Sequence, residues 1–182
     1  MPDVPKRKSV QDLLNVWNHN EKTSLTGAGL QYLSIREMPS WDMICFFMPW
    51  KRYLLGSGYF DKERFGYTGV YRLIALEVKD DITKPATLNR VCGQDMSGTL
   101  YIGEAIDLSR RLNQLRRTAE GRRERSHGAV IMLRQITALD YPPAKLGIAL
   151  MFTGYRTKDI ERDLICAYMN TFGDTPPLNY KL

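Results

Sequence analysis

The second half of the chain alternates between two kinds of apolar spacing, and this limits its fold more than any other feature. Apolar runs rich in β-branched and aromatic residues, typical of strands, occupy 70–78, 99–102 and 145–153. Apolar residues at intervals of three and four, typical of amphipathic helices, occupy 108–119, 126–137 and 158–169. The order is strand, strand, helix, helix, strand, helix, which indicates an α+β domain.

The first 65 residues lack this pattern. Behind Ser9, apolar residues recur at helical spacing from Val10 to Trp17, which predicts one short amphipathic helix. The stretch 23–65 is rich in aromatic residues, glycine and proline, and we expect irregular structure there. We therefore divide the chain into an N-terminal extension, 1–65, and a folded domain, 66–182.

The 182 residues are 43% hydrophobic and 25% charged, as in ordinary soluble globular proteins. The longest apolar run, 43–48, is too short to cross a bilayer, and no signal peptide follows the basic start, so we expect a cytoplasmic protein without a membrane partner. The two histidines, His19 and His127, argue against nucleases that need clustered histidine ligands. Three distant cysteines without CxxC spacing predict neither a zinc ribbon nor a disulfide framework: Cys45, Cys92 and Cys166.

Positive charge is concentrated between 110 and 125. This segment contains seven arginines and two glutamates, in a chain of net charge +6. Guanidinium groups suit bidentate contact with phosphate, although a solvated helix face followed by a basic loop would give the same pattern. With an acidic polymer as partner, six of these arginines would supply salt-dependent, sequence-independent affinity: Arg110, Arg116, Arg117, Arg122, Arg123 and Arg125.

Two tripeptides mark neighbouring predicted strands. Gly69-Val70-Tyr71 opens the first strand, and Tyr101-Ile102-Gly103 closes the second. Each tripeptide alone is a weak signal, since it occurs by chance in about one chain in twenty at average composition, and a tyrosine in a strand is usually a core residue. Their order and their places on neighbouring strands make the pair informative.

Together with the residues that follow them, these tripeptides resemble the GIY-YIG nuclease family over about 69–180; the further matches are Ala105, Asp107, Leu108, Arg111 and Leu112. The resemblance implies a small three-stranded antiparallel sheet flanked by helices, and a metal-dependent DNA endonuclease acting on double-stranded DNA. It also implies a set of catalytic residues at matching positions: Tyr71, Tyr101, Arg111, His127, Glu161 and Asn179.

Helical geometry bears separately on Arg111 and Glu161. On a helical wheel Arg111 borders the apolar stripe of its helix, whereas Arg110 and Arg117 point away from it. Glu161 lies inside the apolar arc of the last helix, where a buried carboxylate needs a cation or a hydrogen-bond partner. Without the motif, a structural glutamate paired with a buried arginine would be the preferred interpretation; the resemblance favours a metal ligand.

The resemblance implies a separate role for each of these residues. Glu161 would hold Mg²⁺ (or Mn²⁺) together with waters and the scissile phosphate. Tyr71 would orient or deprotonate the attacking water, Arg111 would hold the non-bridging oxygens and Tyr101 would assist positioning. Asn179 would brace the site, and the products would carry 5′-phosphate and 3′-hydroxyl ends.

The sequence departs from the family's pattern at two positions. Glu104 follows the second motif where the family often has lysine, and Leu115 stands where many members have histidine or tyrosine. One auxiliary role is therefore vacant, or is filled by His127 or Lys145. The long gap between the two tripeptides and the extra N-terminal region resemble the type II restriction enzymes of the family, and palindromic cleavage would imply a homodimer.

Two alternatives stay open. Glu77 and Lys79 at a strand end, with Asp61 upstream, form a candidate PD-(D/E)xK nuclease site. The second alternative is a non-catalytic DNA-binding module that keeps the fold without the chemistry.

Overall fold

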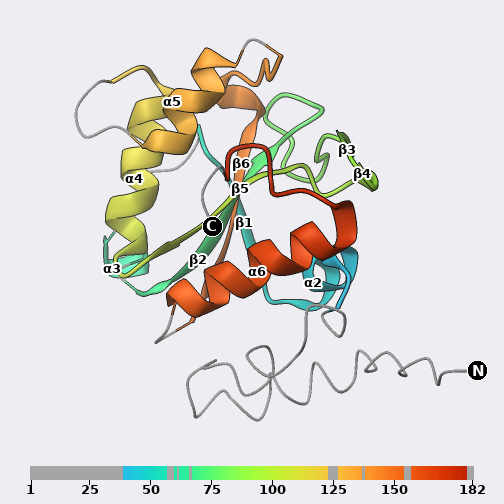
Figure 1. Ribbon diagram of the computed structural model, residues 1–182. Helices are drawn as coiled ribbons and strands as arrows, with labels where there is room; N and C mark the ends of the chain where they lie inside the picture. Colours follow the sequence, from blue (N-terminus) through green and yellow to red (C-terminus); the bar gives the residue numbers. More distant parts are fainter. Residues whose placement is uncertain are drawn as a thin grey trace, which may run out of the picture.

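A computed structural model describes residues 39–56, 60, 62–65, 67–122, 127–136, 138–153 and 157–179. Its centre is a four-stranded antiparallel sheet in the order β1-β6-β2-β5 (Figure 1). The strands are β1 (Lys51–Leu54), β2 (Gly69–Ala75), β5 (Thr99–Ala105) and β6 (Leu146–Phe152). The expected α+β class is confirmed, and the three predicted strands are β2, β5 and β6.

The fourth strand lies in the stretch that was expected to be irregular, and that expectation was wrong for the described part of it. This part contains α2 (Trp41–Phe47), β1 and the short α3 (Lys62–Phe65). β1 has two exposed charged residues followed by two half-buried residues, so it shows no apolar alternation. Its strand conformation comes from pairing with β6, a contact between distant parts of the chain.

Helices cover both faces of the sheet (Figure 1). On one face, Tyr71 and Leu73 pack against α4 (Leu108–Ala119) and α5 (Gly128–Gln135). On the other face, Val70 and Ile102 pack against α2 and α6 (Thr157–Phe172). Successive side chains of a strand point to opposite faces, which is why neighbouring residues of β2 belong to different cores.

The helix boundaries agree with the sequence pattern in most places. α4 matches the predicted 108–119, and α6 begins at Thr157 but continues to Phe172, beyond the predicted end. The N-cap of α5 is His127 rather than Ser126, which lies outside the described residues. The helix predicted behind Ser9 also lies outside them.

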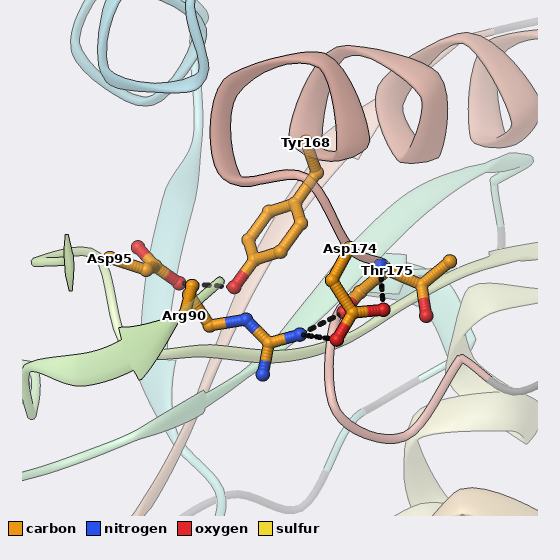
Figure 2. Close-up of polar contacts among 5 residues, drawn as sticks. All are labelled: Arg90, Asp95, Tyr168, Asp174 and Thr175. Carbon is orange, nitrogen blue, oxygen red and sulfur yellow. Dashed lines mark hydrogen bonds and ion pairs between the residues drawn. The ribbon is translucent and has the colours of Figure 1, made fainter. Parts of the chain in front are cut away.

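The segment 79–98, expected to be a long loop, contains a short hairpin of β3 (Leu88–Arg90) and β4 (Gly93–Asp95). Figure 2 shows how this hairpin is joined to the end of α6. Arg90 pairs with Asp174 at 2.9 Å, and the Tyr168 hydroxyl donates a hydrogen bond to the fully buried Asp95 at 3.0 Å. None of the described helices combines the length and the apolar character needed to cross a membrane.

Candidate active site

The two motif tyrosines lie on the same face of the sheet because paired residues share a face and side chains along a strand repeat every two residues. Tyr71 of β2 is paired with Gly103 of β5, and Tyr101 stands two residues before Gly103. The ring centroids of the two tyrosines are 6.0 Å apart. A Cβ at position 103 would lie 2.5 Å from Tyr101 Cε1 and 2.7 Å from Tyr71 Oη, so only glycine leaves room for both rings.

Gly69 has a comparable steric role at the start of β2. A Cβ at this position would lie 2.3 Å from the carbonyl oxygen of Met151 and 2.7 Å from a methyl carbon of Leu108. The first overlap is with backbone, which cannot move aside without disturbing the β2–β6 pairing. The glycine of each tripeptide therefore has a steric reason in this fold.

Tyr71 forms a buried pair with His127. The Tyr71 hydroxyl lies 2.8 Å from His127 Nε2, and both side chains are almost completely buried. The His127 backbone N–H donates to Thr118 Oγ1 at 2.9 Å, which fixes the start of α5 against α4. The Tyr101 ring packs edge-on against the imidazole with centroids 5.4 Å apart. Three aromatic rings thus form one cluster beside the sheet.

Both members of the Tyr71–His127 pair are held neutral. Burial, followed by the proximity of Tyr101, raises the pKa of the Tyr71 phenol well above its usual value. Burial, followed by the positive charge of Arg111, lowers the pKa of His127 to about 3. Arg111 also hydrogen-bonds to Tyr71, and a guanidinium can only donate, so we assign the phenol proton to the bond with His127 Nε2. The remaining ring proton is then on Nδ1, which has no hydrogen-bond partner among the described residues.

Arg111 reaches this cluster from the first turn of α4. That turn is fixed by Asp107, whose side chain accepts a hydrogen bond from the Arg110 backbone N–H at 2.9 Å. The Arg111 side chain is half-buried and donates to Gln114 at 3.2 Å. The positive charge of Arg111 affects the pKa values of Tyr71, His127 and Glu161, so its guanidinium lies near all three groups.

Glu161 approaches from the opposite side, on the second turn of α6. Burial, followed by the negative charge of Glu104, raises the pKa of Glu161 to about 7. The Glu104 carboxylate accepts a hydrogen bond from Thr157 Oγ1 at 2.7 Å, which connects the end of β5 to the first turn of α6. Two carboxylates are therefore close together at this corner of the sheet, an unfavourable arrangement unless a cation or a proton is present.

A cleft of about 570 Å³ opens beside β5, between α5 and α6. Five of the six predicted catalytic residues line it: Tyr101, Arg111, His127, Glu161 and Asn179. The sixth, Tyr71, is fully buried behind the cleft wall, in contact with His127. The predicted residues therefore converge, but Tyr71 does not face the solvent as direct contact with water would require.

Asn179 has a well-defined structural contact at the cleft wall. Its side chain accepts a hydrogen bond from the Ile102 backbone N–H and donates one to the Ile102 carbonyl, both at 2.8 Å. Leu178 adds a backbone bond to Leu100 at 2.9 Å. The tail thus pairs with the outer edge of β5, and Asn179 holds one wall of the cleft in place.

The donor set is compatible with a divalent cation of the Mg²⁺ type. The described residues contain no group of three histidine, cysteine or acidic side chains that could enclose a metal. Mg²⁺ is usually held by only one or two carboxylates, with waters and substrate phosphates completing its octahedron. Glu161 in the cleft, with Glu104 close by, satisfies this smaller requirement.

The arginine-rich segment is only partly described. Arg110 and Arg117 are exposed on α4, and Arg122 is exposed just beyond it. Arg116 is paired with Glu120 at 2.5 Å, which leaves less of its charge for a partner. Arg123 and Arg125 lie outside the described residues.

Several other predicted positions lie away from the cleft. Leu115 is fully buried in the core, and Lys145 precedes β6 at the end of the sheet opposite Gly69, so His127 is the auxiliary candidate that reaches the site. Glu77 and Lys79 are exposed in the turn after β2 and do not line the cleft, while Asp61 lies outside the described residues.

Three residues at the site had no assigned role in the sequence analysis. Gly103 separates the two tyrosine rings, Glu104 acts electrostatically on Glu161, and Lys158 lines the cleft and lowers the pKa of Glu161 against the larger effects that raise it. Glu104 was visible only as a departure from the family pattern. The position of Lys158 could have been found from its spacing of three residues from Glu161 on one helix.

Comparisons of this chain with protein-family models, with curated proteins and with solved structures found no match.

Proposed function

We propose that this protein is a metal-dependent DNA endonuclease of the GIY-YIG type. The observation that carries the proposal is the convergence of Tyr101, Arg111, His127 and Glu161 on one cleft, with Tyr71 bound to His127 behind it. These side chains come from β2, β5, α4, α6 and the start of α5. Such a set supplies a proton acceptor, a phosphate ligand and a metal ligand within one site.

Phosphodiester hydrolysis needs a group that accepts a proton from the attacking water. In our proposal the Tyr71 oxygen accepts this proton while its own proton passes to His127 Nε2, 2.8 Å away. Arg111 leaves Tyr71 for a non-bridging phosphate oxygen when DNA binds, and this movement opens the path by which water reaches the buried phenol. The attacking oxygen bonds to phosphorus as the bond between phosphorus and the 3′ oxygen breaks, and the departing 3′ oxygen takes a proton from solvent water, leaving 5′-phosphate and 3′-hydroxyl ends.

Glu161 would hold the Mg²⁺ or Mn²⁺ ion, which when bound stabilises negative charge on the phosphate and the leaving oxygen. Because the Glu161 pKa is about 7, the carboxylate must lose a proton before it can act as a ligand. Lys158, on the same cleft, contributes positive charge toward the substrate phosphates. Exposed Arg110 and Arg117 supply affinity for the duplex beyond the cleft.

The decisive experiment is incubation of the full chain with supercoiled plasmid and phage DNA in Mg²⁺, with mapping of the cleaved ends. We expect cleavage that is lost in Glu161→Gln, while DNA binding in Ca²⁺ persists. Glu77→Gln is the comparison variant because Glu77 is exposed outside the cleft; cleavage should be retained there, and its loss would favour the PD-(D/E)xK site instead. Discrete bands would support a site-specific, restriction-type enzyme, and nicks or a smear a less specific one.

Three outcomes would overturn the proposal in different ways. Full activity in Glu161→Gln would remove Glu161 from the mechanism. Cleavage that survives Arg111→Ala but is lost in Lys79→Ala would favour a PD-(D/E)xK site. Salt-sensitive binding to DNA without cleavage in Mg²⁺ or Mn²⁺ would favour the second alternative, a DNA-binding module without nuclease activity.

A further inference from the structure

Large exposed apolar side chains gather at the end of the sheet where β2 begins. Tyr67, two residues before β2, is 63% exposed, and Ile106, directly after β5, is 78% exposed. Phe152 ends β6 and is half-buried. Gly69 pairs with Phe152 on one side and with Ala105 on the other, so these strand ends form one row.

Ring, cation and backbone contacts connect these positions into a single surface. The Tyr67 and Phe152 rings meet edge to face with centroids 5.7 Å apart. Lys51 Nζ lies 5.1 Å from the centroid of the Phe152 ring. The segment before β2 is held to Ile106 by a hydrogen bond of 3.1 Å from Thr68 Oγ1 to the Ile106 carbonyl. We call this surface the Tyr67 platform: Lys51, Tyr67, Ile106 and Phe152.

The platform is continuous with the candidate active site through the start of α4. The Leu108 backbone N–H donates to the Tyr67 carbonyl at 3.3 Å. Arg110 is exposed in the following turn, and Arg111 lines the catalytic cleft. The platform and the cleft are therefore connected through one helical turn, the first turn of α4, which carries both Arg110 and Arg111.

The surroundings of the platform favour a nucleic acid over a second copy of this chain. Single exposed aromatic residues are common and need no ligand, but Tyr67 packs on Phe152, whose ring carries the Lys51 ammonium, and the helical turn bonded to the Tyr67 carbonyl carries the exposed Arg110. A second copy would bring together like charges in a chain of net charge +6. An exposed aromatic ring on a surface that also carries cations suits an unpaired base, whose flat face stacks on the ring while its phosphates contact the cations.

We propose that the Tyr67 platform stacks an unpaired base next to the cleaved bond. The preferred substrate is then DNA in which a duplex adjoins an unpaired segment. This inference rests on the proposed nuclease function and names its substrate class. Stacking of one base on an aromatic ring changes affinity by about 5- to 150-fold.

The test uses the full chain in Ca²⁺ and measures binding to two DNAs. One is a continuous duplex; the other is the same duplex with a short unpaired tail that carries 2-aminopurine. We expect Tyr67→Ala to weaken binding of the tailed DNA by about 5- to 150-fold while the duplex changes by about twofold or less. Tyr67→Phe keeps the ring and retains wild-type affinity. 2-Aminopurine fluorescence is quenched by wild type and Tyr67→Phe, but not by Tyr67→Ala.

Val91→Ala is the matched control because Val91 is 73% exposed on the β3–β4 hairpin, outside the platform. Unchanged binding of the tailed DNA by Tyr67→Ala would overturn the inference. So would a Tyr67→Ala variant that sediments as a monomer where wild type sediments as a dimer, with no change in DNA affinity, because the platform would then be a contact between two copies of the chain. Plasmid cleavage that depends on Glu161 would still support the proposed function in either case. Absence of binding to both DNAs by wild type would overturn both proposals.

Discussion

Substitution of Gly103 by alanine tests the geometry of the site most directly. The added Cβ would lie 2.5 Å from Tyr101 Cε1 and 2.7 Å from both Cζ and Oη of Tyr71. Carbon atoms in ordinary contact are about 3.5–4.0 Å apart, so each ring must move by about 1 Å. The Tyr71–His127 hydrogen bond of 2.8 Å cannot survive such a movement unchanged.

Two separate effects follow, each with an expected size. Overpacking of the buried rings should lower the free energy of unfolding by about 1–3 kcal/mol. Displacement of Tyr71 by about 1 Å from its proton acceptor should slow DNA cleavage by about 100-fold. Urea denaturation measures the first effect, and single-turnover plasmid cleavage measures the second on protein shown to be folded by circular dichroism.

Gly56→Ala is the matched control. A Cβ at Gly56 would have the Pro143 carbonyl oxygen, 3.9 Å away, as its nearest neighbour, so the unfolding free energy should change by about 0.5 kcal/mol or less. A Gly103→Ala variant as stable and as active as wild type would contradict the steric role of Gly103 and the part assigned to the two rings.

Three further predictions concern buried ionisable groups. Below pH 6.5 the unfolded chain protonates residue 127 while folded His127, with a pKa of about 3, does not. The contribution of His127 to the unfolding free energy should therefore fall on acidification from pH 6.5 to 4.5, and the difference in unfolding free energy between wild type and His127→Asn should move against wild type over this range. Folded Glu161, with a pKa of about 7 instead of 4.5, holds a proton that the unfolded chain has lost, so its own contribution to the unfolding free energy changes in the opposite direction and falls as pH rises from 4.5 to 7. Glu161→Gln should be about 1 kcal/mol more stable than wild type at pH 8, and Mg²⁺ should stabilise only wild type. A Glu161→Gln variant that follows the wild-type pH profile would contradict this. Asp95 accepts hydrogen bonds from Ser97, Thr99 and Tyr168, so Asp95→Asn should lower the unfolding free energy by about 2 kcal/mol or more in urea denaturation while cleavage per folded molecule is retained; a change below about 0.5 kcal/mol would refute its structural role.

The buried charge of Arg72 shows a limit of sequence reading. Arg72 follows the motif tyrosine in β2 and is fully buried. Its guanidinium carbon lies 4.6 Å from the Trp50 ring centroid and 5.4 Å from that of Trp41, and Nη1 donates to Thr99 Oγ1 at 3.2 Å. An arginine in a strand normally indicates a solvent-facing side. Here two tryptophans from the N-terminal part of the chain cover the Arg72 side chain. The sequence around Arg72 contains no pattern from which this burial could be predicted.

Within the candidate site, too, some features follow from local sequence patterns and others from contacts between distant parts of the chain. The placement of the tripeptides on strands, and of Arg111 and Glu161 at the inward side of their helices, was predictable from local patterns, while their choice as site residues came from the family resemblance. The pairing of Tyr71 with His127, 56 residues away, was not predictable, nor was the effect of Glu104 on Glu161. These depend on how β2, β5, α5 and α6 are placed in space.

By itself, the amino-acid sequence determined the α+β class, the strands β2, β5 and β6, and the extent of α4, since apolar periodicity is a property of neighbouring residues. Only the tertiary structure decided that β1 joins the sheet and that Tyr71 is buried behind the cleft wall. Both depend on contacts between residues far apart along the chain, where backbone pairing and exclusion of water act without leaving a local signature.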